Sequence, residues 1–166
     1  ALSIPAKILS VICEMNNNSL IKELTDNLEY IHISTGHFPL KYRKKLLKYN
    51  TNLYINYGST EAMRTTFLDC KKNRDKIHTE GKPFPGVKIK ILKSNKFNKK
   101  SGEILIKGKN LAYSYENIKI WRSRFVNSFY KSGDLGIIDK NGYLIFKGRI
   151  ENRINFNGKI YNTELI

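Results

Sequence analysis

The sequence predicts an α/β protein in which a partial, layered α/β lobe is followed by an antiparallel, distorted β-barrel lobe. Between residues 4 and 56, apolar residues at helical spacing alternate with apolar runs of strand length, which is typical of a layered sheet. After Pro83 the apolar residues alternate at period two, and turn residues separate the runs. We therefore expect one unit over residues 1–75 and a second over residues 76–150.

Helices and strands are expected in turn along the first unit. Two helical stripes come first, made of Ile8, Leu9, Ile12 and Met15 and then of Leu20, Ile21 and Leu24. Ser19 is the predicted N-cap of the second helix, because its hydroxyl can accept a hydrogen bond from a free backbone N–H. Residues 28–33 predict a buried strand, Pro39 opens a third helix, and residues 52–56 predict the next strand.

The second unit is expected to be a β meander. Residues 87–92, 103–107 and 143–147 alternate polar and apolar side chains, as half-buried strands do. Asn141-Gly142, between two such patterns, is the strongest hairpin signal, because both residues tolerate the positive φ that tight hairpin turns require.

Composition limits the function. The 166 residues are 40% hydrophobic, which suits one real core or two small lobes, and the longest apolar runs have strand length, so we expect no membrane span. The net charge is +16, but the basic residues are spread along the chain without interleaved aromatics, so a nucleic-acid partner is not favoured. Cys13 and Cys70 have no metal-binding spacing; packed or surface thiols in a reducing interior, and hence the cytoplasm, are expected.

Several short motifs occur in a fixed order. They are Gly36-His-Phe-Pro-Leu40, Tyr57-Gly-Ser-Thr-Glu61, Gly81-Lys-Pro-Phe-Pro-Gly86, Gly102-Glu-Ile-Leu-Ile-Lys-Gly108, Tyr130-Lys-Ser-Gly-Asp-Leu135 and Gly148-Arg-Ile-Glu151. Each alone is a weak signal. Together they resemble the adenylate-forming (AMP-binding) enzyme superfamily, and most closely its acyl-CoA synthetases. The resemblance covers nearly the whole chain, but Ser114-Tyr115 departs from the Gly-Tyr that usually ends the barrel strand.

The resemblance implies a role for each residue of the first large motif. Thr60 offers its hydroxyl to the α-phosphate of ATP, and Glu61 offers a carboxylate to Mg²⁺, so these two are the candidate catalytic residues. Tyr57 supplies an aromatic face for adenine, and Gly58 and Ser59 bring the backbone close to the nucleotide. The structural alternative is a turn whose Ser or Thr caps a helix.

The remaining nucleotide contacts are implied in the same way. Asp134 would accept both ribose hydroxyls, and Arg149 would donate to the ribose and phosphates. Gly36 and His37 would lie near adenine or the acyl group, whereas Phe146 is expected in the core. An Asp that binds its own turn is the structural alternative for Asp134.

The resemblance also implies the reaction. A carboxylic acid, with fatty acids among the possibilities, would be activated by ATP and Mg²⁺ as an acyl adenylate and passed to CoA or to the phosphopantetheine of an acidic carrier protein. Glu151 stands at the hinge, and residues 151–166 are expected to form this hinge and the start of a C-terminal domain. The phosphate-binding loop and the C-terminal lysine of the family are not recognisable, so the chain is expected to be an inactive fragment. An amino-acid adenylation domain and a basic, non-catalytic nucleotide- or nucleic-acid-binding module are the alternatives.

Overall fold

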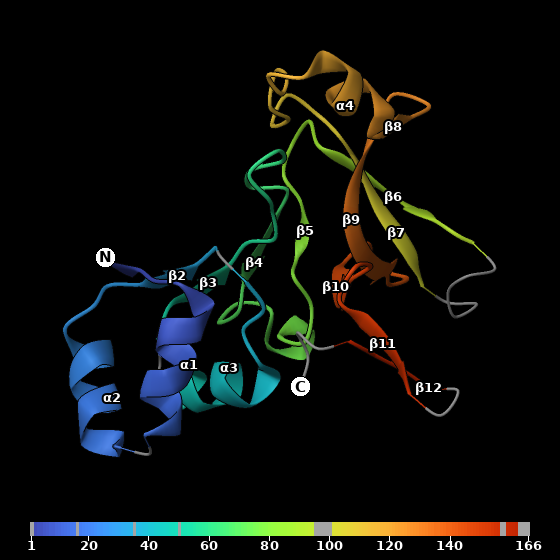
Figure 1. Cartoon of the computed structure of the whole chain (residues 1–166). Helices are drawn as coiled ribbons and strands as arrows, with labels where there is room; N and C mark the ends of the chain where they lie inside the picture. The colour runs from blue at the N-terminus through green and yellow to red at the C-terminus, as the bar shows by residue number, and fades with distance from the viewer. Residues whose placement is uncertain are drawn as a thin grey trace.

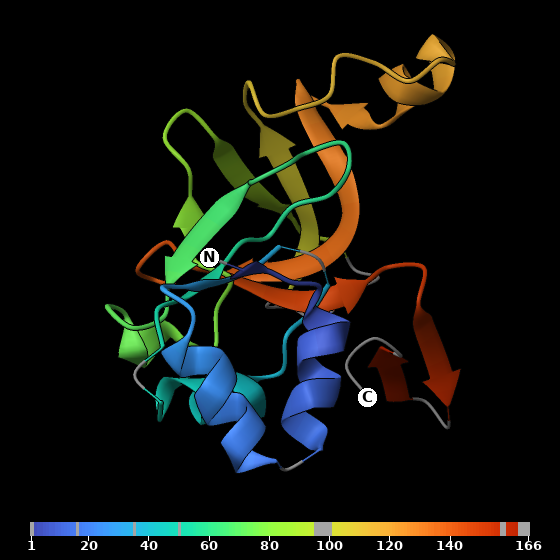
Figure 2. The same cartoon turned by 90° about the vertical axis from the view of Figure 1, so that its left-hand side faces the viewer.

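The structure is a computed structural model, and it describes residues 2–15, 17–34, 36–49, 51–94, 101–156 and 159–162, with side chains up to residue 152. Two five-stranded sheets and a separate two-stranded hairpin form the β structure (Figure 1). Three helices cover the first sheet on one side, and a fourth helix lies at the far end of the second sheet (Figures 1 and 2). The α/β lobe followed by a curled antiparallel sheet confirms the predicted fold class.

The first sheet has the order β1-β2-β3-β4-β5. Its strands are Leu2–Ser3, Ile31–Ile33, Leu53–Ile55, Thr66–Asp69 and Lys82–Pro83. The first three strands are parallel, and β4 and β5 add antiparallel pairs. A short 3₁₀ turn, Arg74–Lys76, lies between β4 and β5. Because β5 belongs to this sheet, the first sheet continues past residue 75.

The helices between the parallel strands supply the core of the first lobe. They are α1 (Ala6–Glu14), α2 (Asn18–Asp26) and α3 (Leu40–Leu47). Leu9 of α1, Ile21 of α2 and Leu46 of α3 are fully buried in one cluster with Ile31 and Leu53 of the sheet. Burial takes the apolar surface of these side chains out of water. This stabilises the lobe by roughly 1.5–3 kcal/mol for each large side chain.

The second sheet has the order β10-β9-β7-β6, with β8 paired to β9. Its strands are β6 (Lys88–Leu92), β7 (Gly102–Lys107), β8 (Phe125–Val126), β9 (Phe129–Ile138) and β10 (Leu144–Arg149). All the pairs are antiparallel, and the predicted hairpin at Asn141-Gly142 joins β9 to β10. Helix α4 (Ile118–Ser123) precedes β8. The hairpin of β11 (Arg153–Phe156) and β12 (Lys159–Asn162) projects beside this sheet (Figure 1).

Several sequence-based expectations need correction. Asn17, not Ser19, caps α2: its side-chain oxygen accepts a hydrogen bond from the Leu20 N–H at 3.0 Å. In α1 the buried face is Ala6, Leu9 and Cys13, whereas Ile8 and Met15 are exposed. The small side chains of Ala6 and Cys13 let α1 lie close to its neighbours, and a stripe chosen by hydrophobicity alone overlooks them. The strand expected from residue 28 begins only at Ile31.

The cysteines behave as packed thiols. Both Cys13 and Cys70 are free and buried. Burial raises the pKa of the Cys70 thiol to about 12, so it stays protonated and unreactive at neutral pH. In the part of the chain that the structure describes, no helix is both long enough and apolar enough to cross a bilayer.

Candidate functional site

Two adjoining cavities open where the parallel strands end. Their volumes are about 960 and 670 Å³, and both are lined by Ser34, Gly36, Asn56, Gly58 and Arg149. Ser34 and Gly36 follow β2, and Asn56 and Gly58 follow β3, so the carboxyl ends of two neighbouring parallel strands form the cavity floor. Open α/β sheets bind their ligands at this edge, because the loops leaving adjacent strands diverge there.

The structure brings the sequence-predicted nucleotide and catalytic residues together at these cavities. The first cavity contains Gly36, Gly58, Ser59, Thr60, Glu61 and Arg149 in its lining, and the second contains Gly36, His37, Tyr57, Gly58, Asp134 and Arg149. Glu151, the predicted hinge residue, is an exposed turn residue after β10 and is not among the residues that line either cavity. The roles of these residues and the domain limits remain predictions.

The loop that follows β3 is folded tightly on itself. The Ser59 and Ala62 backbones exchange hydrogen bonds, N–H to carbonyl, at 3.1 and 3.2 Å, and the Thr65 N–H donates to the Tyr57 carbonyl at 2.8 Å. A Cβ on Gly58 would lie 2.8 Å from the Ala62 carbonyl oxygen. Gly58 is therefore required first by the packing of the loop, before any contact with a nucleotide. Within this loop Thr60 is exposed at the first cavity.

Glu61 is held by a residue that the sequence analysis did not place in the site. The Tyr115 hydroxyl donates to Glu61 Oε1 at 2.7 Å, and the Ala112 N–H donates to the Glu61 carbonyl at 2.8 Å. Burial raises the pKa of the Glu61 carboxyl, but hydrogen bonds from Tyr115, its own backbone and Ser59, together with the charge of Arg149, outweigh it, so the net pKa is lowered. Glu61 is thus an ionised, oriented carboxylate. The available signal for Tyr115 was that it keeps the tyrosine of the family's usual Gly-Tyr, although Ser114 departs from the glycine.

Asp134 is the centre of a second polar group. It is 3% exposed, its Oδ2 accepts a hydrogen bond from the Tyr57 hydroxyl at 2.7 Å, and its Oδ1 lies 3.3 Å from Arg149 Nε. Burial, followed by the negative charge of Asp134, raises the pKa of Tyr57 far above its usual value, so this phenol remains a hydrogen-bond donor. The Asp134 N–H donates to the Ser132 hydroxyl at 3.1 Å, which fixes the strand at this point.

A β-bulge places Arg149 opposite Asp134. In the β9–β10 ladder Phe146 pairs with Gly136 and Arg149 pairs with Asp134, so three steps along β10 match two along β9. Gly148 has φ +92°, a conformation that residues with side chains rarely adopt. Without the extra residue Arg149 would pair one position further and point to the other face of the sheet. In the Gly148-Arg149 motif, the glycine therefore allows the bulge, and the bulge turns Arg149 toward Asp134.

Rings line the inner part of the second cavity. Phe146 lies 6.0 Å from Tyr57 and 6.2 Å from His37 between ring centroids, and the His37 and Phe146 planes differ by 27°. Phe146 packs against the buried cluster of the second sheet, as predicted for a core residue, and it also lines the cavity. Such flat apolar faces can stack on a planar heterocycle.

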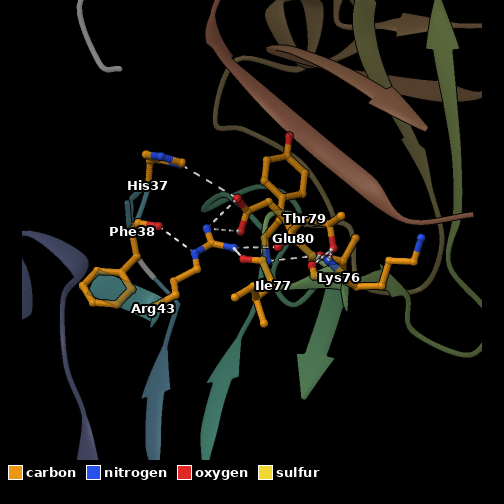
Figure 3. Close-up of polar contacts among 10 residues, drawn as sticks. His37, Phe38, Arg43, Lys76, Ile77, Thr79 and Glu80 are labelled. Carbon is orange, nitrogen blue, oxygen red and sulfur yellow. Dashed lines mark hydrogen bonds and ion pairs between the residues drawn. The ribbon is translucent and has the colours of Figure 1, made fainter. Parts of the chain in front are cut away.

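Glu80 also lines the second cavity, and sequence reasoning missed it. Its carboxylate pairs with the buried Arg43, and His37 Nδ1 lies 3.8 Å from Glu80 Oε1 (Figure 3). The string Arg43-Lys44-Lys45 gave only a general basic signal. The position of an acid immediately before the Gly81-Lys-Pro turn was the only sequence signal for Glu80.

A magnesium ion at this site would be held jointly by the protein and by the phosphates of a bound nucleotide. Among the described residues no group of three or more His, Cys, Asp or Glu side chains could hold a metal. Mg²⁺ in nucleotide sites is commonly bound by one or two carboxylates together with phosphate oxygens and water. Glu61, ionised and facing the first cavity, is the residue that could supply the protein carboxylate.

Comparison with known proteins finds similarity to AMP-binding enzymes. The family model described as "AMP-binding enzyme" matches residues 6–116. The 2-succinylbenzoate–CoA ligase of Staphylococcus epidermidis is 31% identical over 119 residues, which cover 70% of this chain and 24% of that enzyme. The corresponding ligase of Bacillus subtilis is 28% identical over 155 residues, 89% of this chain and 32% of that enzyme.

A solved structure extends the match to the fold. The o-succinylbenzoate CoA synthetase of Bacillus subtilis, in complex with its acyl-adenylate intermediate, superimposes with a TM-score of 0.77 at 26% identity, covering 96% of this chain and 33% of that one. The chain thus spans about a third or less of the length of these relatives. Because the family model covers more than half of its residues and the fold agrees, this chain belongs to the AMP-binding enzyme family.

Proposed function

We propose that this chain is the nucleotide-binding part of an AMP-forming ligase that joins a carboxylic acid to a thiol. The observation that carries the proposal is the meeting of Glu61, Asp134 and Arg149 around two cavities that share a floor. An ionised carboxylate for a metal, a buried acceptor and a flexible cation are the groups that a magnesium–nucleotide complex requires.

The proposed first step forms an acyl adenylate. A carboxylate oxygen of the substrate attacks the α-phosphorus of ATP, the bond from that phosphorus to the bridging oxygen breaks, and pyrophosphate leaves. Asp134 would hold the ribose hydroxyls, with Tyr57 fixing its second oxygen at 2.7 Å. Thr60 would donate to the α-phosphate from the exposed end of its loop. Bound Mg²⁺ would neutralise charge on the phosphates, and Glu61 would hold it in place.

The proposed second step transfers the acyl group to a thiol. The thiol loses its proton to solvent, its sulfur attacks the acyl carbon, and AMP leaves with the electron pair of the broken C–O bond. The relatives named above are CoA ligases, which favours CoA over a carrier protein as the acceptor. Their names give succinylbenzoate as the acid, so they do not favour a fatty acid. Met63 and Arg64 line the first cavity beside the motif loop and are the candidate contacts for the acid.

The test uses an extended protein, in which the two ends of this chain are joined to the corresponding flanking segments of the Bacillus subtilis 2-succinylbenzoate–CoA ligase. We expect it to exchange radiolabelled pyrophosphate into ATP only when a suitable carboxylic acid is present, and to release AMP when CoA is added. A panel of aromatic, aliphatic and amino acids identifies the substrate class. A folded extended protein that binds ATP but exchanges pyrophosphate with none of these acids would contradict the proposal.

A further inference from the structure

Arg43 is a buried arginine whose three side-chain nitrogens all form hydrogen bonds inside the protein (Figure 3). Its side chain is 1% exposed. Nε donates to the Phe38 carbonyl at 2.7 Å, Nη1 donates to the carbonyls of Ile77 and Thr79 at 3.1 and 2.6 Å, and Nη2 donates to both oxygens of Glu80 at 2.8 and 3.0 Å. A guanidinium carries its N–H groups on three nitrogens, and each of the three nitrogens makes at least one of these contacts. Because Arg43 is buried and does not line the second cavity, its role is to orient other groups.

Glu80 differs from Arg43 in that it has remaining hydrogen-bonding capacity. An ionised carboxylate has about four acceptor positions on two oxygens and no donor. Arg43 uses one position on each oxygen, and Glu80 borders the second cavity. Because both oxygens of this buried carboxylate contact the same charged nitrogen, Arg43 Nη2, the pair holds the carboxylate in one orientation. The cavity wall thus presents a fixed group that accepts hydrogen bonds and disfavours other acceptors.

The location of Glu80 relative to the ribose contact follows from β10. At the first residue of this strand, the Leu144 carbonyl accepts the Glu80 N–H at 2.7 Å. At its last residue, Arg149 faces Asp134. Phe146 lies between these two points and contributes its ring to the cavity. Glu80, Phe146 and Asp134 therefore line the same cavity, with Phe146 between the other two along β10.

We propose that Glu80, positioned by Arg43, selects the base of the nucleotide by accepting a hydrogen bond from an exocyclic amino group. This inference rests on the proposed function, because it takes Asp134 as the ribose contact. With the sugar at Asp134 and the base against Phe146 and Tyr57, the far edge of a purine points to Glu80. A 6-amino group donates to the carboxylate, and a purine without it leaves the carboxylate without a ligand donor. His37, stacked beside Phe146, closes the same side of the cavity.

The first measurement needs no mutation. NMR titrations of the 166-residue chain compare AMP with purine riboside 5′-monophosphate, which has the same sugar and phosphate but no 6-amino group. A hydrogen bond to a charged group predicts a dissociation constant about 10- to 100-fold higher for the purine compound. Equal dissociation constants would overturn the assignment of Glu80. Failure of both nucleotides to bind would instead overturn the proposed function, and this inference with it.

The second measurement separates base selection from a structural role. Glu80→Gln keeps an acceptor for Arg43 but replaces the ionised carboxylate by a neutral amide. We expect the preference for AMP over the purine compound to fall below about tenfold, because neutral hydrogen bonds are weaker than charged ones. Glu103→Gln is the matched control: its carboxylate accepts the Gly133 N–H at 3.1 Å, next to the ribose contact, and does not line the second cavity. It should change the affinity of both nucleotides equally. An unchanged preference in folded Glu80→Gln would show that the Arg43–Glu80 pair is structural only.

Discussion

At the scale of single residues, Glu61 is the side chain whose charge matters most in the proposed reaction. Glu61→Gln should leave the fold intact and reduce pyrophosphate exchange by the extended protein about 10²–10³-fold. The reason is that one electrostatic contact made mainly in the transition state contributes roughly 3–4 kcal/mol. The amide still accepts the Tyr115 hydrogen bond seen at 2.7 Å, so the loss would reflect charge rather than position.

The control for this prediction is the same change on an exposed acid. Glu116 lies near Tyr115 in sequence but is exposed and lines neither cavity, so Glu116→Gln should exchange pyrophosphate at the unmodified rate. Exchange by Glu61→Gln at that same rate would remove Glu61 from the reaction. Thermal unfolding of both variants checks that the comparison is between folded proteins.

Asp134 gives a prediction about the sugar. Asp134→Ala should weaken ATP binding to the extended protein, since two hydrogen bonds to a charged group, about 1.5–3 kcal/mol each, are lost. The 2′,3′-dideoxy analogue of ATP should bind the unmodified protein less tightly by a similar amount, and should bind Asp134→Ala almost as well as ATP does. Calorimetry of the four combinations measures this cycle, and additive losses would mean that Asp134 does not contact the ribose.

The residues that could be predicted are those that belong to local strings. Glu61, Asp134 and Arg149 stand in short motifs, and the structure brings all three to the cavities. Arg43 and Glu80 could not be paired from the sequence, because 37 positions separate them and an arginine in a basic string usually stays in solvent. Only the return of the chain after β4 brings Glu80 to α3, and no local pattern encodes that contact.

At the scale of secondary structure, the bulge in β10 yields a prediction that separates strain from function. Gly148→Ala places a side chain at φ +92° and should lower the free energy of unfolding by about 1–3 kcal/mol. It should also weaken AMP binding about tenfold, because a regular ladder would turn Arg149 away from Asp134. Urea unfolding and NMR titration measure the two effects.

Gly142→Ala is the matched control for Gly148→Ala. Gly142 has φ +82° in the β9–β10 hairpin, with no atom within 4 Å of an added Cβ. It lines neither cavity, so Gly142→Ala should reduce stability by a comparable amount and leave AMP binding unchanged. If Gly148→Ala bound AMP as well as Gly142→Ala does, the bulge would have no role in placing Arg149.

Helix α3 is tied to the segment before β5 by Arg43. Arg43→Ala should lower the free energy of unfolding by about 3–5 kcal/mol, because it leaves Glu80 charged and buried and deprives three backbone carbonyls of their donors. Lys44→Ala, at the adjacent exposed position of the same helix, should change it by less than about 0.5 kcal/mol. Similar urea unfolding curves for the two variants would contradict a stabilising role for the buried arginine.

Elements with a regular pattern were predictable, and those interrupted by functional residues were not. The period-two runs predicted β6, β7 and β10, and Asn141-Gly142 predicted the hairpin. Strand β9 runs unbroken from Phe129 to Ile138, although Ser132-Gly133-Asp134 in its middle has the composition of a turn. In the ladder with β7, Leu105 pairs with Lys131 and Glu103 pairs with Leu135, so a bulge lies between these pairs, and Gly133 within it has φ +76°. The turn-like residues are thus accommodated as a bulge within a strand, and a period-two pattern does not predict such a bulge.

At the scale of the whole molecule, the site lies where the two lobes meet. The first sheet supplies the loops after β2 and β3, and the second supplies Asp134, Phe146 and Arg149. The Tyr57–Asp134 hydrogen bond joins residues 77 positions apart and links the lobes directly. Because neither lobe contains the site alone, a nucleotide would stabilise their contact, and binding would couple to the packing between the sheets.

The last prediction concerns what these residues do alone. Residues 1–166 supply the proposed base, ribose and α-phosphate contacts, whereas no β,γ-phosphate loop or C-terminal lysine of the family is recognisable in the sequence. We expect the chain to bind ATP weakly and to form no acyl adenylate, because the groups of an active site act together and losing some of them removes nearly all activity. With a net charge of +16, part of that binding should come from exposed cations, and it should fade as added salt screens them.

The extended protein should turn over at a rate insensitive to moderate salt. A mass-spectrometric assay for acyl-AMP compares the two proteins directly. Acyl adenylate formed by the 166 residues alone would mean that residues now assigned other roles, with Lys131 and His37 the first candidates, carry the chemistry.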